Sequence, residues 1–325
     1  NAIHGHVELS TGDPSQGIIV SLLESQIQEG RSAWHPRDST RVRADGSYRF
    51  AHLPDGDYAV VANPASENGD STLPEPSSNR LSASGFPQLY YPDSPTFSGA
   101  AHLHVSGGEQ AQADLPLTLR TFHLVRARVL LPTGFRAQFP EAPVQVEVTT
   151  ADNTRAPYPT QYDPKTDIVR AMLPDGSYTI FITALQPMRS ATQRPPRPLT
   201  GSGAIAVAGH PLPNLRIPVG APLPNPLQVS IARTSATPQN QNSGNVYIYI
   251  TQAWPLSDGM QSEYAQGAAP GALDTMAPIA GRYWIHTSIG DPALCEASFT
   301  AGGASLAREP LTVGPGRATA PLTLS

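Results

Sequence analysis

The chain has 325 residues, of which 39% are hydrophobic and only 14% are charged, with a net charge of −5. Its 35 prolines and 27 glycines leave no long window with a clean helical period, which predicts an all-β protein. The acidic balance lacks the clustered positive charge of a nucleic-acid surface, and the single cysteine, Cys295, excludes an intrachain disulfide.

Residues 1–119 read as a first domain. Its opening strand alternates Ile3, Gly5, Val7 and Leu9 with polar residues, as one apolar face of a sheet requires. A second strand, a turn of the Asp-Gly type, the stretch Leu53–Val61 and two closing strands follow, and residues 63–99 read as a loop. The corresponding residues are 18–22, 44–50, 53–61, 102–105 and 115–119.

These motifs resemble the carboxypeptidase regulatory-like family. The resemblance rests on Ile-x-Gly-x-Val at residue 3, Ala-Asp-Gly-Ser-Tyr-x-Phe at residue 44, Leu-Pro-x-Gly-x-Tyr at residue 53, a closing Leu-x-Leu, and a Tyr90-Tyr91-Pro92 insertion. It implies a prealbumin-like (transthyretin-like) seven-stranded sandwich in a secreted or surface protein. It does not imply peptidase activity, because the family is an accessory domain of carboxypeptidases.

The stretch Leu53–Val61 recurs farther along the chain. A second copy runs from Leu173 to Phe181, and a worn third copy runs from Ala277 to Ile285. Each is a Pro/Gly turn followed by alternating apolar residues that begin with a tyrosine. We therefore expect three tandem prealbumin/immunoglobulin-like β-sandwich domains, at 1–119, 120–221 and 222–325, with the three tyrosines buried in equivalent strands. The tyrosines are Tyr58, Tyr178 and Tyr283.

Two His-x-His pairs are the sharpest candidates for metal binding. His4 and His6, and likewise His102 and His104, are two residues apart on a strand and hence on one face. Such a pair can chelate zinc or copper, but a joint site requires the two strands to be neighbours in one sheet. The alternative is that these histidines alternate with core positions and face solvent.

Exposed aromatic rings are a second kind of candidate, because β-sandwiches often bind sugars on aromatic platforms. The available residues are Trp34, Tyr90, Tyr91, Trp254, Tyr264 and Trp284. Trp34 and Trp254 lie in loop-like sequence, where a core role is harder to assign. The alternative is local packing of long loops under an aromatic lid.

The sequence offers little for catalysis. It contains no Gly-x-Ser-x-Gly elbow, His-Glu-x-x-His motif or glycine-rich phosphate loop. Cys295 reads as a small hydrophobe, and Asp45, Asp55 and Asp175 are explained by their tight turns. We expect no enzyme activity and no cofactor.

The partner that the sequence favours most is another copy of the same chain, in a homopolymer. Strands reach both chain ends, and Pro116 and Pro321 in the closing strands would blunt or mark a sheet edge. Residues 1–9 could pair within their own chain or with a neighbour. No apolar run is long enough to span a membrane, and a start at Asn1 rather than Met suggests removal of an export signal.

The expected function is therefore a non-catalytic, secreted structural protein at the cell surface. It would be a subunit of a filament or adhesive assembly, built by β-strand addition or end-to-end contacts. The alternatives are a carbohydrate-binding accessory module and a monomeric surface spacer.

Overall fold

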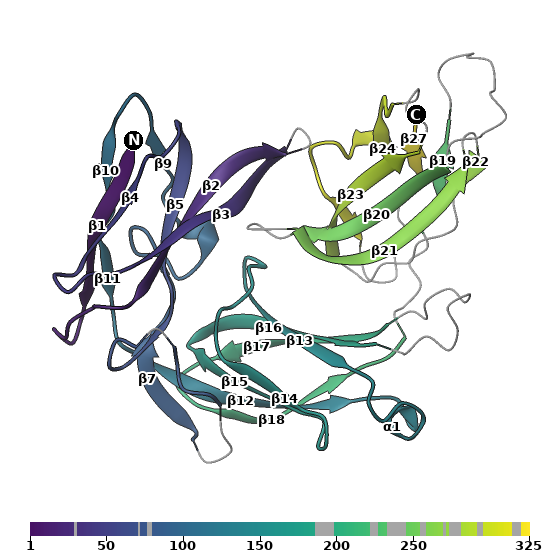
Figure 1. Cartoon of the computed structure of the whole chain (residues 1–325). Coiled ribbons are helices and arrows are strands. Elements are labelled where there is room, and N and C mark those ends of the chain that lie inside the picture. The colour runs from purple at the N-terminus through teal and green to yellow at the C-terminus, as the bar shows by residue number, and fades with distance from the viewer. Residues whose placement is uncertain are drawn as a thin grey trace. The chain divides into compact units, whose positions relative to one another are not determined.

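The computed structural model describes residues 1–325 except 29–30, 71, 77–79, 186–197, 222–226, 233–244, 254–257, 269–270, 273–280, 291–294 and 314–319. The regular secondary structure of the described chain is almost all β-strand, as the sequence predicts, and its helices are the short α1 (Phe135–Gln138) and the single-turn η1 (Phe97–Gly99). Neither of these helices has the length and apolarity that crossing a bilayer requires. In Figure 1 the strands are coloured along the chain, from purple at the N-terminus to yellow at the C-terminus.

Residues 1–119, the first segment, form two facing sheets. One sheet has the order β10-β1-β11, with β4 also paired to β1, and the other has the order β3-β2-β5-β8, with β9 also paired to β5. The strands are β1 (Ala2–Leu9), β2 (Ile19–Gln28), β3 (Arg31–Arg41), β4 (Ser47–Ala51), β5 (Gly56–Ala62), β6 (Ala65–Ser66), β7 (Ser82–Phe86), β8 (Leu89–Tyr90), β9 (Leu103–Val105), β10 (Gln110–Gln112) and β11 (Leu115–Leu117).

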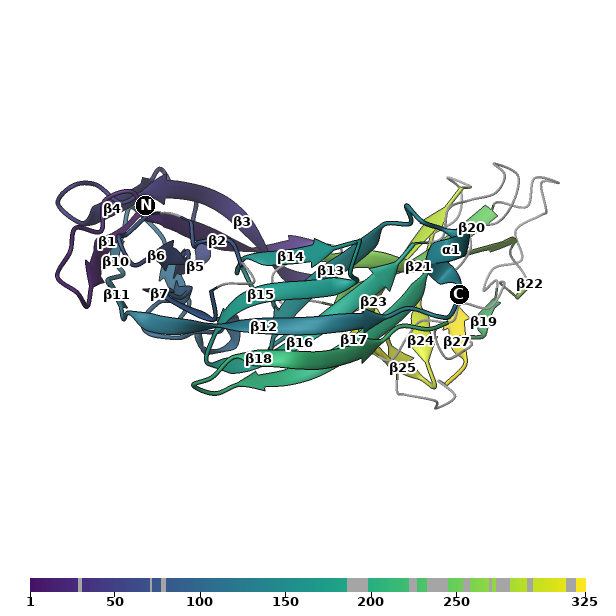
Figure 2. The same ribbon diagram turned by 90° about the horizontal axis from the view of Figure 1, so that it is seen from below.

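Residues 120–221, the second segment, also form two sheets. A six-stranded sheet has the order β14-β15-β12-β7-β6, with β18 also paired to β12, and a three-stranded sheet has the order β13-β16-β17. Figure 2 shows β15, β12 and β18 side by side. The strands are β12 (Arg120–Leu130), β13 (Val144–Thr150), β14 (Thr160–Asp163), β15 (Ile168–Pro174), β16 (Gly176–Ala184), β17 (Leu199–Val207) and β18 (Leu212–Pro218).

Residues 222–325, the third segment, form sheets with the orders β21-β20-β23-β26 and β22-β19-β27-β24-β25. The strands are β19 (Val229–Ile231), β20 (Asn245–Ala253), β21 (Asp258–Ala268), β22 (Gly271–Ala272), β23 (Gly281–Ile289), β24 (Phe299–Ala301), β25 (Ala304–Ser305), β26 (Leu311–Val313) and β27 (Leu322–Leu324).

The three segments share one strand arrangement. The first strand of each (β1, β12, β19) pairs in parallel with its closing strand (β11, β18, β27) and antiparallel with β4, β15 or β22. The strand that carries the recurring tyrosine (β5, β16, β23) lies in the opposite sheet between two antiparallel neighbours.

The recurring tyrosines are buried, as predicted. Tyr58, Tyr178 and Tyr283 are 0%, 6% and 0% exposed. The Oη atoms of Tyr58 and Tyr178 each donate a hydrogen bond of 3.1 Å to the carbonyl of the proline four residues earlier, Pro54 or Pro174. The turn and the buried ring are thus one unit, which explains why Pro, Gly and Tyr recur together.

Each segment surrounds a hydrophobic cluster of its own. Residues that contact one another group the chain into two compact units. One unit contains residues 1–25 and 34–221, and the other contains residues 26–33 and 222–325. The division into three domains at 119/120 and 221/222 stays a prediction.

The stretch 63–99 is not simply the loop that its composition suggests. Its strand β7 pairs with β12 from Arg120 to His123, and Leu73 belongs to the hydrophobic cluster of the second segment. The backbone N–H of Ser98 also donates to Asp152 Oδ2 over 3.0 Å. This stretch therefore ties the first segment to the second.

The N-terminal strand is satisfied within its own chain. Residues Ala2–His6 pair with β4 on one side, and β10 and β11 occupy the other side. Of the two alternatives for residues 1–9, the structure shows pairing within their own chain.

The two prolines of the closing strands differ in position. Pro116 lies in β11, whose single strand partner in the described chain is β1, so the prediction of an edge is confirmed there. Pro321 instead precedes β27, which is paired on both sides with β19 and β24, so the predicted edge is wrong there.

Candidate functional site

The four histidines proposed for metal binding lie in two different sheets. His4 and His6 are on β1, whereas His104 is on β9 and His102 immediately precedes it, and β9 pairs with β5 in the opposite sheet. The condition for a joint site, neighbouring strands in one sheet, is not met because the chain crosses between sheets before β9.

The histidines find other neighbours instead. His6 Nδ1 is 3.9 Å from Asp114 Oδ1, and His104 Nδ1 is 2.8 Å from Asp57 Oδ1. No group of three or more His, Cys, Asp or Glu side chains that could hold a metal ion occurs among the described residues. The structure thus keeps the two His-x-His pairs apart, and metal binding by either pair stays a prediction.

Some of the proposed aromatic contact residues meet in one cluster. The ring of Trp34, on β3, lies 4.4 Å from the ring of His102 and 5.4 Å from that of Phe97, between centroids. Tyr90 is fully buried and contacts Phe97 edge-on at 5.8 Å, and Tyr91 is half-buried. Because neighbouring rings cover much of Trp34, this cluster matches the packing alternative better than an open sugar platform.

The other aromatic candidates belong to the third segment. Trp254 and the side chain of Tyr264 lie outside the described residues. Trp284 lies on β23 and is half-buried. The sugar-binding role of the aromatic residues stays a prediction.

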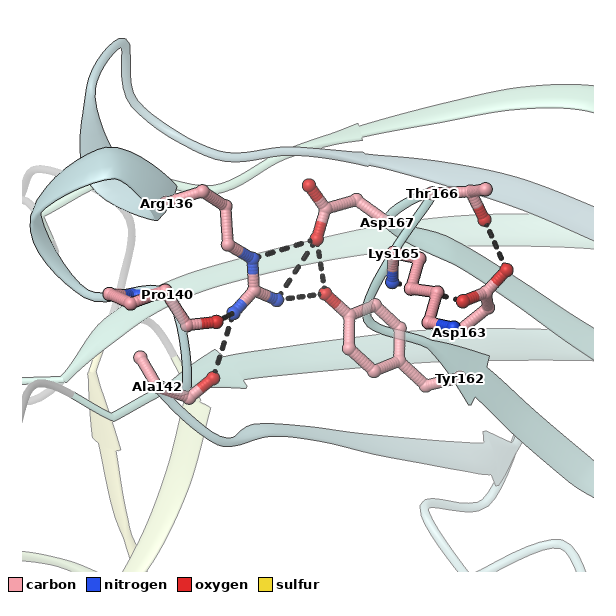
Figure 3. Close-up of polar contacts among 8 residues, drawn as sticks. All are labelled: Arg136, Pro140, Ala142, Tyr162, Asp163, Lys165, Thr166 and Asp167. Atoms are coloured by element: carbon pink, nitrogen blue, oxygen red, sulfur yellow. Dashed lines mark hydrogen bonds and ion pairs between the residues drawn. The ribbon is translucent and has the colours of Figure 1, made fainter.

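A polar cluster that the sequence did not indicate lies at one end of the second segment (Figure 3). Arg136 projects from α1, and its Nε and Nη2 atoms donate to Asp167 Oδ1 over 3.1 Å and 2.9 Å. Nη2 also donates to the hydroxyl of Tyr162, from β14, and that hydroxyl donates to Asp167 Oδ1 over 2.5 Å. Nη1 donates to the carbonyl of Ala142 over 2.9 Å.

The protonation state of this cluster is fixed by its surroundings. Burial raises the pKa of Tyr162 to about 12, and the hydrogen bond to Asp167 acts in the same direction. Burial alone would lower the pKa of Arg136. The hydrogen bond to Asp167 and the contact with Tyr162 outweigh burial, so that this pKa lies above its ordinary value. At neutral pH the cluster therefore holds a protonated phenol and a paired charge.

The arrangement suits a brace between α1 and the β14–β15 hairpin better than a reactive site. A shallow depression of about 650 Å³, lined by residues 128–137 and 165–167, adjoins it. However, the donors of Arg136 point at Asp167, Tyr162 and backbone carbonyls (Figure 3). Nothing local in the sequence connects Asp167 to Arg136, which is 31 residues away.

No family model matches the sequence, and no curated protein matches it. Solved structures do match at low similarity. The TIE protein of Bacillus anthracis is 10% identical with a TM-score of 0.21, over 89% of this chain and 45% of its own length. This chain thus spans less than half of that protein.

Two pilins are also among the matching structures. The minor pilin GBS52 of Streptococcus agalactiae is 10% identical with a TM-score of 0.28, over 69% of this chain and 98% of its own. The major pilin subunit BcpA of Bacillus cereus is 9% identical with a TM-score of 0.19, over 100% of this chain and 95% of its own. Such TM-scores are too low to establish a shared fold, so a pilus role is a property of those proteins and is not transferred to this chain.

Proposed function

We propose that this chain is a non-catalytic structural protein of the cell surface, a subunit of a filamentous or adhesive assembly that carries tension along the chain. The observation that supports this most is the parallel pairing of the first and closing strands in each of the three segments.

The geometry of a parallel pair gives the physical reason. The beginning of one strand and the end of the other lie at opposite ends of the pair, and its hydrogen bonds are evenly spaced. A pull on the two ends of such a segment slides the strands past each other, so that all bonds of the pair resist together. A pull that separates neighbouring ends would break the same bonds one after another.

The length of the parallel pairing differs among the segments. The register gives three pairs of β1 with β10 and three with β11, five pairs of β12 with β18, and three pairs of β19 with β27. In single-molecule pulling through the chain ends, we therefore expect the third segment to yield at the lowest force. If the third segment is instead the last to unfold, the parallel pairs do not set the resistance.

The connection between the first two segments also suits a load-bearing part. The pairing of β7 with β12, the burial of Leu73 and the bond from Ser98 to Asp152 limit bending between these segments. The proposed setting outside the cell rests on the resemblance to secreted accessory domains described above.

Assembly would use end-to-end or edge contacts, because β1 is already paired on both sides. Sedimentation velocity and negative-stain microscopy of the purified chain test this part. At about 50 μM, a concentration that populates complexes with micromolar Kd, we expect oligomers or short filaments. A strictly monomeric species would contradict the assembly and favour a monomeric spacer.

A further inference from the structure

Four arginines gather on the outer face of the sheet in the second segment. On β12, the residues Val125, Ala127 and Val129 point into the core, so Arg126 and Arg128 point outward. Arg126 lies directly opposite Arg170 on β15, and Arg128 lies directly opposite Arg216 on β18. Figure 2 shows these three strands side by side. We call this set the arginine face.

This arrangement brings like charges together. Neighbouring strands are about 4.8 Å apart, and residues two apart on a strand are separated by about 6.7 Å. Like charges directly opposite each other on adjacent strands destabilise a sheet. The face is therefore costly to the fold, in a chain whose net charge is −5.

The fold does not neutralise these charges with close partners. Within the described part of the chain, no carboxylate lies at ion-pair distance from any of the four arginines. The Nε of Arg170 is buried and has no hydrogen-bond partner there. Asp163 lies within electrostatic range of Arg170, but its carboxylate accepts from Lys165 and Thr166 of its own turn.

The arginine face is also hollowed. Arg126, Arg128 and Arg216 line an open cavity of about 280 Å³, which Ile168 and the residues Pro213–Leu215 complete. Guanidinium groups pair with carboxylates through two parallel hydrogen bonds. The apolar side chains and the Asn214 amide suit the faces and hydroxyls of a sugar ring, which a bare inorganic anion lacks.

We propose that the arginine face binds an acidic polysaccharide, with the carboxylates of successive sugar residues on Arg126, Arg128 and Arg216. The observations that carry this are the charge complementarity of an unneutralised cationic sheet face and the mixed lining of its cavity. The site is separate from the aromatic cluster around Trp34. It uses side chains on the outer face of β12 and β18, whereas tension is borne by the backbone hydrogen bonds between these two strands.

Binding of polygalacturonate to the full chain by isothermal titration calorimetry tests the proposal. Neutral dextran of similar length and linear polyphosphate are the comparison ligands. We expect polygalacturonate to bind, with an affinity that falls as salt rises, and dextran not to bind. Because each lost guanidinium–carboxylate contact weakens binding several-fold or more, the double variant Arg128→Gln/Arg216→Gln should bind at least about tenfold more weakly.

The matched control is Arg43→Gln/Arg49→Gln, which removes the same charge from exposed positions of the first segment and should bind as the natural chain does. The Arg128→Gln/Arg216→Gln variant should unfold at the same urea concentration as the natural chain or at a higher one, because a like-charge pair is removed. The single variant Arg126→Gln is a second test of the binding, and it should also bind polygalacturonate more weakly than the natural chain does. Equal loss in the control pair, equally tight binding of polyphosphate, or no binding of polygalacturonate would each overturn the proposal.

Discussion

At the recurring turns, each buried tyrosine ring folds back over the glycine two residues before it. A Cβ atom placed at Gly56, Gly176 or Gly281 would have the side chain of the tyrosine two residues later as its nearest neighbour. In the first two copies, the tyrosine hydroxyl also donates a hydrogen bond to the carbonyl of the proline at the start of the turn. The burial of these tyrosines was predictable from the sequence, because Pro, Gly and Tyr recur at fixed spacing. The hydrogen bond from the tyrosine to the proline was not.

Gly5 is a second position where close approach demands glycine. A Cβ there would lie 2.1 Å from the carbonyl oxygen of Ala113, which also accepts a hydrogen bond from the Tyr48 hydroxyl. We expect Gly5→Ala to destabilise the chain by about 3 kcal/mol in urea unfolding, since backbone must move. Gly220→Ala, where a Cβ meets nothing within 4 Å, is the control; similar losses in both would contradict the close approach.

Tyr162 carries a pH dependence whose sign follows from its environment. Its pKa in the folded chain is about 12, above the ordinary value of 10.0. The stabilising contribution of the neutral phenol is therefore complete below pH 10 and is lost as the pH rises towards 12. In spectrophotometric titration, Tyr162→Phe should remove one phenol that ionises near pH 12; removal of one that ionises near pH 10 would contradict the buried brace with Arg136 and Asp167.

At the scale of elements, the sequence predicted best where alternation was strong. The opening strand, in which Ile3, Gly5, Val7 and Leu9 alternate with polar residues, is β1. The strand β7 was missed because Ser82–Phe86 has no alternating apolar pattern, and its strand forms by pairing with β12, which starts 34 residues after β7 ends. The arginine face was likewise invisible, since its members meet only through register.

The tie between the first two segments should be measurable through Leu73. This side chain is 9% exposed and lies in the second segment's hydrophobic cluster. We expect Leu73→Ala to cost about 2–4 kcal/mol in urea unfolding. Leu81→Ala, at a 57% exposed position of the same stretch, should stay within about 0.5 kcal/mol. Equal effects would show that the stretch 63–99 does not contribute to that core.

At the scale of the whole molecule, one strand arrangement is used three times. The sequence indicated the repetition through its tyrosines, but the parallel contact between first and closing strands joins residues about 90 or more positions apart and leaves no local signal. This contact gives each segment a direction in which it resists force, and this is why we infer a role in bearing tension.

The most direct test compares two pulling directions on the same strand pair. Cysteine handles at Arg120 and Pro218, in a chain with the exposed Cys295 changed to Ser, load β12 and β18 in shear. Handles at Leu130 and Pro218, which are register partners at neighbouring strand ends, peel the two strands apart. We predict a clearly higher unfolding force for the first pair of handles than for the second, whereas equal forces would contradict a load-bearing role of the parallel strands.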